Sequence, residues 1–397
     1  MTASSSSPTH IDALIVGAGP VGLTAAVVMS RRGARIRVID ASPSGASTSR
    51  AAVIHARTLE VLADIGLAPR MIEEGVIVPD FTVRARNRKL AHIDFRGLRT
   101  PYPFTLMLSQ ARTEELLASA LSDSGCGVER EVAFESFEST SSGRVAVLRH
   151  GDGTRETVDA RFVIGADGSH SRVRQQLGVD FEGAEYADSF VLADVSMVWP
   201  LAPTEVQLFL AEQGLMVVAP LPGGHHRIVA TMDDAPARPT VAHIQHLLDE
   251  RGPGQTTVHS LAWSSRFRVA HRLAARYREG NVFLAGDAAH VHSPAGGQGM
   301  NLGIQDAVDL GSHLLDVLSG TRHEDTLAEY ELIRRPAAVK VIAFTDRMTR
   351  MATLRTPVLR HLRDATIRTV LSSPRRQSRL ARRIAQLQDG EVRVPTY

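Results

Sequence analysis

The hydrophobic positions at the start of the chain predict a strand, a helix and a second strand in close succession. Ala13–Val16 is a short apolar run, Leu23–Arg32 has an apolar face at helical spacing and ends at Gly33, and Ile36–Ile39 is a second apolar run. The first run leads directly into the glycine-rich turn Gly17–Gly22. A strand, a tight turn, a helix and a strand in this order are typical of the opening unit of a parallel sheet.

Apolar runs enter glycine-bearing turns at two further places. Phe162–Ile164 leads into Gly165-Ala-Asp-Gly168 and then into a helix. Val282–Ala285 leads into Gly286-Asp287, which is followed by the loop Pro294–Gly299 and by a helix from Asn301 onward. The chain therefore repeats one local pattern, an apolar strand followed by a glycine turn, at three distant positions.

The middle of the chain alternates between apolar and polar residues, which predicts antiparallel strands. Two hairpins are expected, one around Asn87-Arg-Lys89 and one around Gly151-Asp-Gly153. Further alternating runs follow before a helix over Val241–Arg251; they are Val191–Val195, Val206–Leu210, Leu215–Ala219 and Arg227–Thr231. We expect these runs to form an antiparallel sheet between the glycine turns and the helices near the end of the chain. The last predicted helical stretch, Leu354–Gln388, is rich in arginine, and we expect it to pack on the protein with a solvated arginine face.

Composition narrows the class of protein. The 397 residues are 43% apolar and carry a net charge of only +2, so nothing in the charge balance predicts a nucleic-acid partner. No apolar run approaches the roughly 18 residues that a membrane span needs. The single cysteine, Cys126, excludes an internal disulfide and favours a reducing, cytoplasmic setting. Residues 1–9 are rich in serine and are expected to be a disordered tail.

The first turn, Gly17-Ala-Gly19-Pro20-Val21-Gly22, has the spacing of a dinucleotide-binding turn. Gly17 permits the tight turn, Gly19 lets a pyrophosphate approach the backbone, and Gly22 allows the helix to pack on the strand. Asp40, at the end of the second strand, is placed to accept hydrogen bonds from ribose hydroxyls. This motif alone does not distinguish NAD from FAD.

The third turn favours a flavin. An acidic residue at a strand end, here Asp287, can hold a chain of sugar-like hydroxyls, and the glycines let backbone N–H groups at a helix N-terminus approach an electron-rich ring. The N–H groups around Gly299 to Leu302, which include those of Met300 and Asn301, are the candidates for that contact. For the middle turn, two interpretations stay open: Asp167 and Gly168 contribute to a dinucleotide site, or Asp167 is simply a helix cap.

The histidines do not predict a metal site. His290 and His292 have no evident third ligand, and we expect none. His225 and His226 lie at a predicted hairpin tip, where we expect both to be solvated rather than catalytic.

The three turns, in this order and spacing, resemble the motifs of FAD-dependent single-component aromatic hydroxylases, the group that includes p-hydroxybenzoate hydroxylase and the polyketide hydroxylases. Gly17–Gly22 resembles the ADP-binding motif of that family, Gly165–Gly168 its middle motif for FAD and the nicotinamide donor, and Gly286-Asp287 its riboflavin-binding motif. Two more stretches are similar to flavin-contacting segments of the family, Ser49–Glu60 through Arg50 and Leu108–Leu117 through Gln110.

The chain departs from the family pattern at two positions. Asp40 stands where many relatives have Glu, which keeps a carboxylate at the ribose. Ser293-Pro294 stands where many relatives have two prolines.

The resemblance implies a fold and a division into parts. It implies an α/β protein with a Rossmann-type, glutathione-reductase-like FAD-binding domain, an inserted antiparallel β-sheet domain for the substrate, and a C-terminal helical segment. The expected boundaries are residues 10–78, 98–182 and 272–330 for the discontinuous FAD domain, 79–97 and 183–271 for the sheet domain, and 331–397 for the helical region.

The resemblance also implies a reaction. NADH or NADPH would reduce FAD bound without a covalent link, O2 would form a flavin C4a-hydroperoxide, and a phenolic or polycyclic aromatic small molecule would be hydroxylated. Asp287 would hold the ribityl chain, and Pro294 would face the substrate and the flavin as the catalytic position. The substrate wall is expected on the antiparallel sheet, with Trp263 nearby; the candidates are Gln207, Phe209, Met216 and Val218. Alternation places them on common faces of the sheet, and the alternative for each of them is simple core packing.

Other functions remain open on the same fold. They are a flavoprotein reductase or dehydrogenase, and a non-catalytic protein that binds FAD or a ligand. The identity of the substrate, the choice between NADH and NADPH, and the choice between a monomer and a homodimer do not follow from the sequence.

Overall fold

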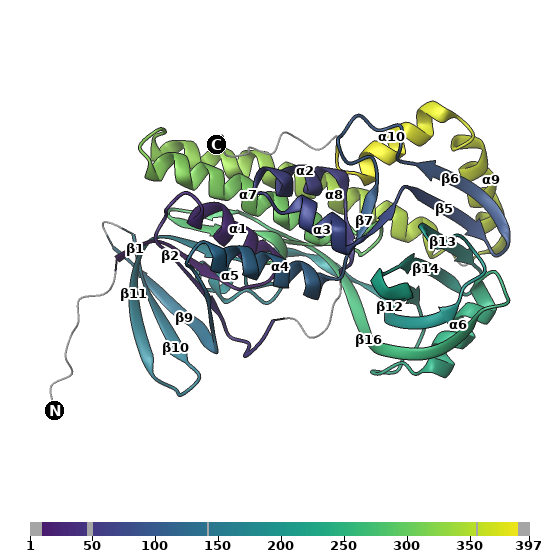
Figure 1. The fold of residues 1–397 in the computed structure, drawn as a ribbon, viewed down its shortest axis with the longest axis horizontal. Helices are drawn as coiled ribbons and strands as arrows, with labels where there is room; N and C mark the ends of the chain where they lie inside the picture. The colour runs from purple at the N-terminus through teal and green to yellow at the C-terminus, as the bar shows by residue number, and fades with distance from the viewer. Residues whose placement is uncertain (1–9, 46–50, 141–142, 355, 388–397) are drawn as a thin grey trace.

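A computed structural model describes residues 10–45, 51–140, 143–354 and 356–387 (Figure 1). The expected tail, residues 1–9, and the flavin-contact candidate Arg50 lie outside the described residues. The described chain forms a mixed α/β fold with two large sheets, a small third sheet and a helical C-terminal part, which confirms the predicted fold class.

The first large sheet has a parallel centre. Its strand order is β17-β18-β11-β1-β2-β8, and β9 and β10 extend it in antiparallel fashion from β11. Every neighbouring pair from β18 to β8 is parallel. The strands are β1 (His10–Val16), β2 (Ile36–Asp40), β8 (Val128–Arg130), β9 (Val132–Ser139), β10 (Arg144–His150), β11 (Arg155–Gly165), β17 (Arg278–Glu279) and β18 (Val282–Leu284).

Helix α1 (Pro20–Ser30) is buried along almost its whole length, as expected for a helix that is apolar on every side. It packs against α4 (Gln110–Asp123) and α7 (Gly299–Leu318), so that both the first and the third turn feed helices into the same core. The smaller elements beside this core are β3 (Val53–Ile54), α2 (Ala56–Asp64), α3 (Ala68–Glu74), β4 (Val76–Val78), β7 (Thr105–Met107) and α5 (Arg172–Gln176).

The second large sheet has the order β19-β16-β12-β15-β14-β13-β5-β6. All of its pairs are antiparallel except β13 with β5, which come from distant parts of the chain and run parallel. The strands are β5 (Asp80–Ala85), β6 (Arg88–Asp94), β12 (Phe181–Val198), β13 (Glu205–Ala211), β14 (Gly214–Pro220), β15 (His226–Thr231), β16 (Thr257–Ala274) and β19 (His290–Val291).

The two longest strands, β12 and β16, join the sheets. They pair with each other over most of their length, and at one end Phe181 and Ala274 pack into the first core. Helix α6 (Val241–Arg251) covers one face of the second sheet (Figure 1).

The C-terminal part is broken where one continuous helical stretch was predicted. Helix α8 (Ala328–Ala352) is followed by α9 (Pro357–Val370) and α10 (Pro374–Ile384), which lie beside β5 and β6 (Figure 1). Pro374 starts α10 in its first turn, because proline cannot continue a helix but is compatible with its first positions. In α10, Ala381 and Ile384 are buried and the arginines Arg375, Arg376 and Arg379 are exposed, as expected from the sequence. Arg363 of α9 differs from this expectation, since it is buried and paired with Asp364.

None of the helices in the described ranges combines the length and the apolar character that crossing a membrane requires.

Candidate flavin and substrate site

The three glycine turns lie side by side at the carboxyl edge of the first sheet. In the parallel register, Val16 of β1 is opposite Gly165 of β11, and Gly165 is opposite Leu284 of β18. Backbone hydrogen bonds continue this row into the turns, since Ala166 N donates to Val16 O (2.8 Å) and Ala285 N donates to Gly165 O (3.0 Å). In open parallel sheets, ligands bind at this edge.

The first turn approaches the backbone of the second very closely. Gly17 has φ +101°, and a Cβ at this position would lie 2.4 Å from the carbonyl oxygen of Ala166. A Cβ on Gly22 would lie 1.9 Å from the carbonyl oxygen of Gly17. A Cβ on Gly19, in contrast, would meet nothing within 4 Å. Gly17 and Gly22 are therefore required by the protein itself, whereas the open side of Gly19, directly before the α1 N-terminus, fits a pyrophosphate.

Asp40 lies beside this turn, at the end of β2. Its carboxylate accepts hydrogen bonds from the backbone N–H groups of Ala18 and Ser42, each 2.8 Å long. The guanidinium of Arg130 is 3.7 Å away. These contacts hold the carboxylate next to the turn, a position that fits the expected contact with ribose hydroxyls.

The geometry of Asp167 matches that of a helix cap. Its carboxylate accepts hydrogen bonds from the backbone N–H groups of Arg172 and Val173, at the start of α5, and from the hydroxyl of Ser171. Burial raises the pKa of Asp167 against the effect of these hydrogen bonds. Gly168 has φ +79°, and a Cβ there would meet nothing within 4 Å. The open face of the middle turn is thus at Gly168 rather than at the carboxylate.

The third turn is held against the first by one side chain. Gly286 has φ +60°, and a Cβ added to it would lie 2.7 Å from Val21 of α1. A Cβ on Gly303 of α7 would lie 2.6 Å from the same valine. Asp287 follows in the turn Gly286–Ala288, and its side chain is exposed. The backbone of the third turn therefore touches α1, while Asp287 lies at the surface, where a ribityl chain could reach it.

The loop after the third turn leads directly into α7. Pro294 is exposed, and its carbonyl oxygen accepts a hydrogen bond from Gly297 N (2.9 Å). Gly296 and Gly297 both have positive φ angles, +77° and +64°. Helix α7 begins at Gly299, two residues earlier than expected, so Gly299, Met300 and Asn301 form its first turn. Their N–H groups have no partner within the helix.

The side chain of Asn301 is used by the protein itself. Its side-chain N–H group donates to Val53 O and Gly297 O, each at 2.7 Å, and its Oδ1 accepts from His55 N at 2.7 Å. The side chain is fully buried and saturated by the protein's own backbone. Only the backbone N–H group of Asn301 can therefore serve a cofactor, while the side chain fixes the loop.

Gln110 is the first residue of α4, as expected. Its Oε1 accepts a hydrogen bond from Ala51 N (3.2 Å), and its Nε2 donates to Glu114 (2.9 Å). Gln110 thus holds the backbone of Ala51, the residue directly after Arg50 in the sequence.

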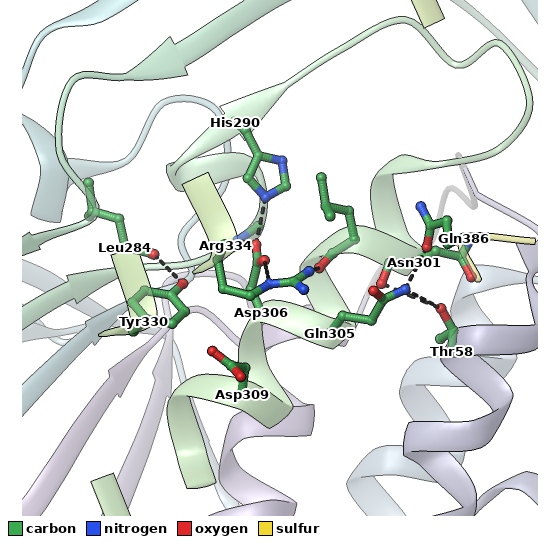
Figure 2. Close-up of polar contacts among 12 residues, drawn as sticks. Thr58, Leu284, His290, Asn301, Gln305, Asp306, Asp309, Tyr330, Arg334 and Gln386 are labelled. Atoms are coloured by element: carbon green, nitrogen blue, oxygen red, sulfur yellow. Dashed lines mark hydrogen bonds and ion pairs between the residues drawn. The ribbon is translucent and has the colours of Figure 1, made fainter. Parts of the chain in front are cut away.

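A buried polar cluster lies beneath the third turn, and sequence reasoning missed it (Figure 2). Asp306 of α7 accepts hydrogen bonds from His290 Nε2 (2.6 Å), from Arg334 Nε (2.7 Å) and from the backbone N–H of Gly286 (3.3 Å). Burial alone raises the pKa of Asp306, but His290 and Arg334 outweigh it and hold the pKa below its ordinary value. Arg334 Nη2 also donates to Leu302 O (3.3 Å) in the first turn of α7. The cluster therefore joins the Gly286 turn to the α7 N-terminus.

The four substrate-wall candidates face away from the cofactor turns. Gln207 and Phe209 of β13 lie opposite Val218 and Met216 of β14, so all four are on one face of the sheet. That face is covered by α6: Phe209, Met216 and Val218 are buried in a core with Ile244, Leu247 and Leu248. Gln207 is buried as well, bonded to Arg84 and Glu205. The burial of these side chains fits the alternative of core packing, because strand alternation defines two faces but does not say which one a helix covers.

The opposite face of β13 and β14 contacts the small sheet of β3, β4 and β7. We call this small sheet, together with the first large sheet and its helices, the nucleotide-binding part. Val217 is half-buried there beside Ala52, Val53 and Met107, next to the strands β3 and β7. Trp263 lies on this side too, where its indole N–H donates to Asp194 (2.8 Å), which also pairs with Arg227 (2.7 Å).

A pocket of about 340 Å³ opens between the start of α4 and the second large sheet. Its walls include Leu108, Ser109 and Arg112 from the start of α4, and Asp194, Leu221 and Ala262 from the second sheet. Its size falls in the range of small-molecule sites.

The histidines differ from expectation at one position. His225 is exposed, as expected, but His226 is buried beside Trp199, and burial lowers its pKa. In the β15 register His226 shares the α6 side of the sheet with Ile228. Among the described residues, no group of three or more His, Cys, Asp or Glu side chains is arranged to hold a metal ion.

These features define an α/β protein whose parallel-sheet edge is built for a flavin nucleotide and faces a second sheet across a pocket. The family model described as "FAD binding domain" matches residues 10–345, and the chain belongs to this family, which includes FAD-dependent aromatic hydroxylases.

Two relatives are similar over most of the chain. The 6-methylpretetramide 4-monooxygenase of Streptomyces rimosus is 39% identical over 351 residues, which are 87% of this chain and 63% of that protein. The pentachlorophenol 4-monooxygenase of Sphingobium chlorophenolicum is 37% identical over 84% of this chain and 64% of its own length. This chain thus spans less than two thirds of either relative.

Solved structures agree with the fold. The anhydrotetracycline hydroxylase of Streptomyces rimosus superposes with a TM-score of 0.81 and 32% identity, over 98% of this chain and 78% of that one. The p-nitrophenol 4-monooxygenase of Pseudomonas putida shares the fold with a TM-score of 0.85 at 24% identity, over 97% of this chain and all of its own.

Proposed function

We propose that this protein is an FAD-dependent monooxygenase that hydroxylates a phenolic or polycyclic aromatic small molecule with O2 and NADH or NADPH. The observation that carries the proposal is the meeting of three glycine turns, Gly17–Gly22, Gly165–Gly168 and Gly286-Asp287, at one sheet edge. The names of the relatives, which act on a pretetramide and on pentachlorophenol, support the reaction class and the aromatic substrate.

The chain's residues fit FAD. The open side of Gly19 and the α1 N-terminus would receive the pyrophosphate, and Asp40 would bind the adenosine ribose. Asp287 would hold the ribityl chain, and the first N–H groups of α7 would lie at the edge of the ring that becomes negative on reduction. The proposed set is completed by Arg50, Gln110, Asp167 and Gly168. Asp167 would act indirectly, by capping the start of α5.

When bound and reduced by the nicotinamide, FAD would supply the oxygen-transfer chemistry, with a C4a-hydroperoxide as the hydroxylating species. The protein's part is to position the aromatic ring and to exclude water. We assign this task to the exposed Pro294, to the half-buried sheet face at Val217, and to the pocket between α4 and the second sheet. The single cysteine is in keeping with a cytoplasmic reaction.

The test starts with the purified protein. We expect it to bind FAD, and we expect certain phenols or polycyclic aromatics to stimulate both NAD(P)H oxidation and O2 consumption. Incorporation of one labelled oxygen atom from 18O2 into the product, measured by mass spectrometry, identifies a hydroxylase.

Other outcomes distinguish the alternatives. Nicotinamide oxidation without oxygen incorporation would indicate a reductase or dehydrogenase. FAD binding without substrate-stimulated oxidation would indicate a non-catalytic flavin or ligand protein. Sedimentation of the same preparation tests the homodimer.

A further inference from the structure

The end of the last helix is inserted next to the loop that the proposed function places at the flavin ring. Gln386 follows α10 in a left-handed conformation (φ +58°), and its side chain is almost completely buried. Its Nε2 donates to Gln298 Oε1 (2.7 Å), and its Oε1 accepts from Gln305 of α7 (2.5 Å; Figure 2). A residue far along the chain thus contacts both the loop and the helix that follows it.

Gln298, in turn, points its amide toward the protein. Its Nε2 donates to Gly296 O (2.9 Å) and to Ile384 O (3.1 Å), and its side chain is buried. A second backbone contact ties the same segment to α2, because Arg57 N donates to Ala385 O (3.2 Å). Residues Ile384–Gln386 are therefore hydrogen-bonded to the loop Pro294–Gln298 through Gln298 and to α2 through Arg57.

The loop has little rigidity of its own. Two consecutive glycines, Gly296 and Gly297, have positive φ angles, and glycine loses more conformational freedom on ordering than any other residue. Removing the Gln386 side chain would take away the donor to the buried Oε1 of Gln298 and one of the two acceptors of Gln305 Nε2, which is unfavourable as long as these atoms stay buried. The contact thus favours one loop conformation over many.

We infer that the segment Ile384–Gln386 is a latch that holds the loop Pro294–Gln298 in its flavin-binding conformation, with Gln386 as a positioning residue. This segment lies beyond the matched family region, which ends at residue 345. The inference rests on the flavin-binding part of the proposed function and is independent of hydroxylation. Since coupling is reciprocal, FAD should in turn stabilise the latch.

Hydrogen–deuterium exchange of the apo-protein tests the latch without the cofactor. Gln386→Met keeps the length of the side chain and removes both hydrogen bonds, so it serves if Gln386→Ala fails to fold. We expect exchange in peptides covering residues 294–298 to accelerate about fivefold or more in either variant, while β1 is unchanged. In the wild type, FAD should slow exchange in residues 384–387.

The affinity for FAD, measured by flavin fluorescence titration, completes the test. We expect Gln386→Met to raise the Kd for FAD about fivefold to tenfold. Gln377→Ala is the matched control, since Gln377 lies on α10 and donates to Leu371 O, away from the loop. Its Kd should equal that of the wild type.

Three results would overturn the inference. The first is that Gln386→Met changes neither the Kd for FAD nor the exchange of the loop. The second is that Gln377→Ala raises the Kd as much as Gln386→Met does. The third is that the wild-type protein takes up no FAD. The last result would also remove the proposed function, whereas the first two leave it intact.

Discussion

Asp306 and Arg334 form an ion pair with an Oδ1–Nε distance of 2.7 Å, and both side chains are completely buried. Asp306 lies on α7 and Arg334 on α8, so the pair joins two helices behind the third glycine turn. A buried charge is tolerated in a protein core only when it has a partner. Because Asp306 also accepts a hydrogen bond from Gly286 N and Arg334 also donates to Leu302 O, the pair supports both the third turn and the start of α7.

Arg334→Met should be strongly destabilising, because it leaves the Asp306 carboxylate buried without its cation. We expect the free energy of unfolding to fall by about 3–5 kcal/mol, measured by urea denaturation. Arg347→Met is the control, since Arg347 is an exposed arginine on the same helix and its replacement should change stability by less than about 0.5 kcal/mol. Equal stabilities of the two variants would contradict a structural role for the pair.

Two glycines of the first turn should respond differently to alanine. Gly17→Ala places a Cβ against the Ala166 carbonyl and forces a positive φ, so we expect a loss of about 2 kcal/mol or more of unfolding free energy. In Gly19→Ala the added Cβ meets no protein atom within 4 Å and the backbone is extended, so the free energy of unfolding should stay within about 0.5 kcal/mol of the wild type. The Kd for FAD should rise about tenfold or more, because the Cβ would occupy the side of the turn that we assign to the pyrophosphate. Denaturation and flavin titration of both variants separate the roles. Normal FAD affinity in a stable Gly19→Ala protein would exclude pyrophosphate binding at this turn.

Local patterns were enough to predict the cofactor edge of the fold. A strand, a glycine turn and a helix are adjacent in sequence, and parallel pairing then brings such turns together at the carboxyl edge. The positions of Gly17, Gly165 and Gly286 follow from these local rules alone.

Relationships between distant elements could not be predicted in this way. Nothing in the sequence pairs Asp306 with Arg334, or Gln298 with Gln386. Strand β16 was missed because arginines and histidines interrupt its alternation, whereas pairing with β12 along its length decides its structure. The face of β14 that meets the nucleotide-binding part depends on where α6 packs, and for the same reason His226 is buried instead of solvated.

Asp287→Ala should abolish tight FAD binding while the fold is retained. The side chain is exposed at the third turn, so its removal leaves no cavity, but the proposed contact with the ribityl hydroxyls is lost. We expect purified Asp287→Ala to contain little or no flavin, with an apo-protein melting temperature close to that of the wild type. Asp123→Ala, at an exposed position near the end of α4, is the control and should keep its flavin. Full flavin content in Asp287→Ala would remove this residue from the site.

Stability should decrease in mild acid because of two histidines, the buried His55 and the half-buried His292. Burial lowers the pKa of His55 and of His292 from 6.5 to about 4. Between these pH values the unfolded chain binds more protons than the folded one, so the free energy of unfolding falls as the pH drops from 6.5 toward 4. The loss is roughly 3 kcal/mol for each histidine, and the contribution is fully present above pH 6.5.

The variant His55→Gln tests the origin of this pH dependence. Glutamine retains a polar side chain at this position but does not titrate. We expect urea denaturation between pH 4.5 and 7.5 to show a pH slope about half as steep as that of the wild type, because His292 remains. An unchanged slope would show that other groups cause the acid sensitivity.

The two faces of β14 provide the sharpest test of where the substrate lies. Val217 is half-buried on the side of the nucleotide-binding part, and its neighbour Val218 is buried against α6. Val218→Phe overfills a packed core and should cost about 1–3 kcal/mol of unfolding free energy, with KM for the aromatic substrate unchanged. Val217→Phe adds the same volume on the half-buried face to which we assign the substrate, so it should raise KM about tenfold or more at nearly wild-type stability. Measured KM and urea denaturation of both variants decide between the faces, and a raised KM in Val218→Phe alone would place the substrate on the side of α6.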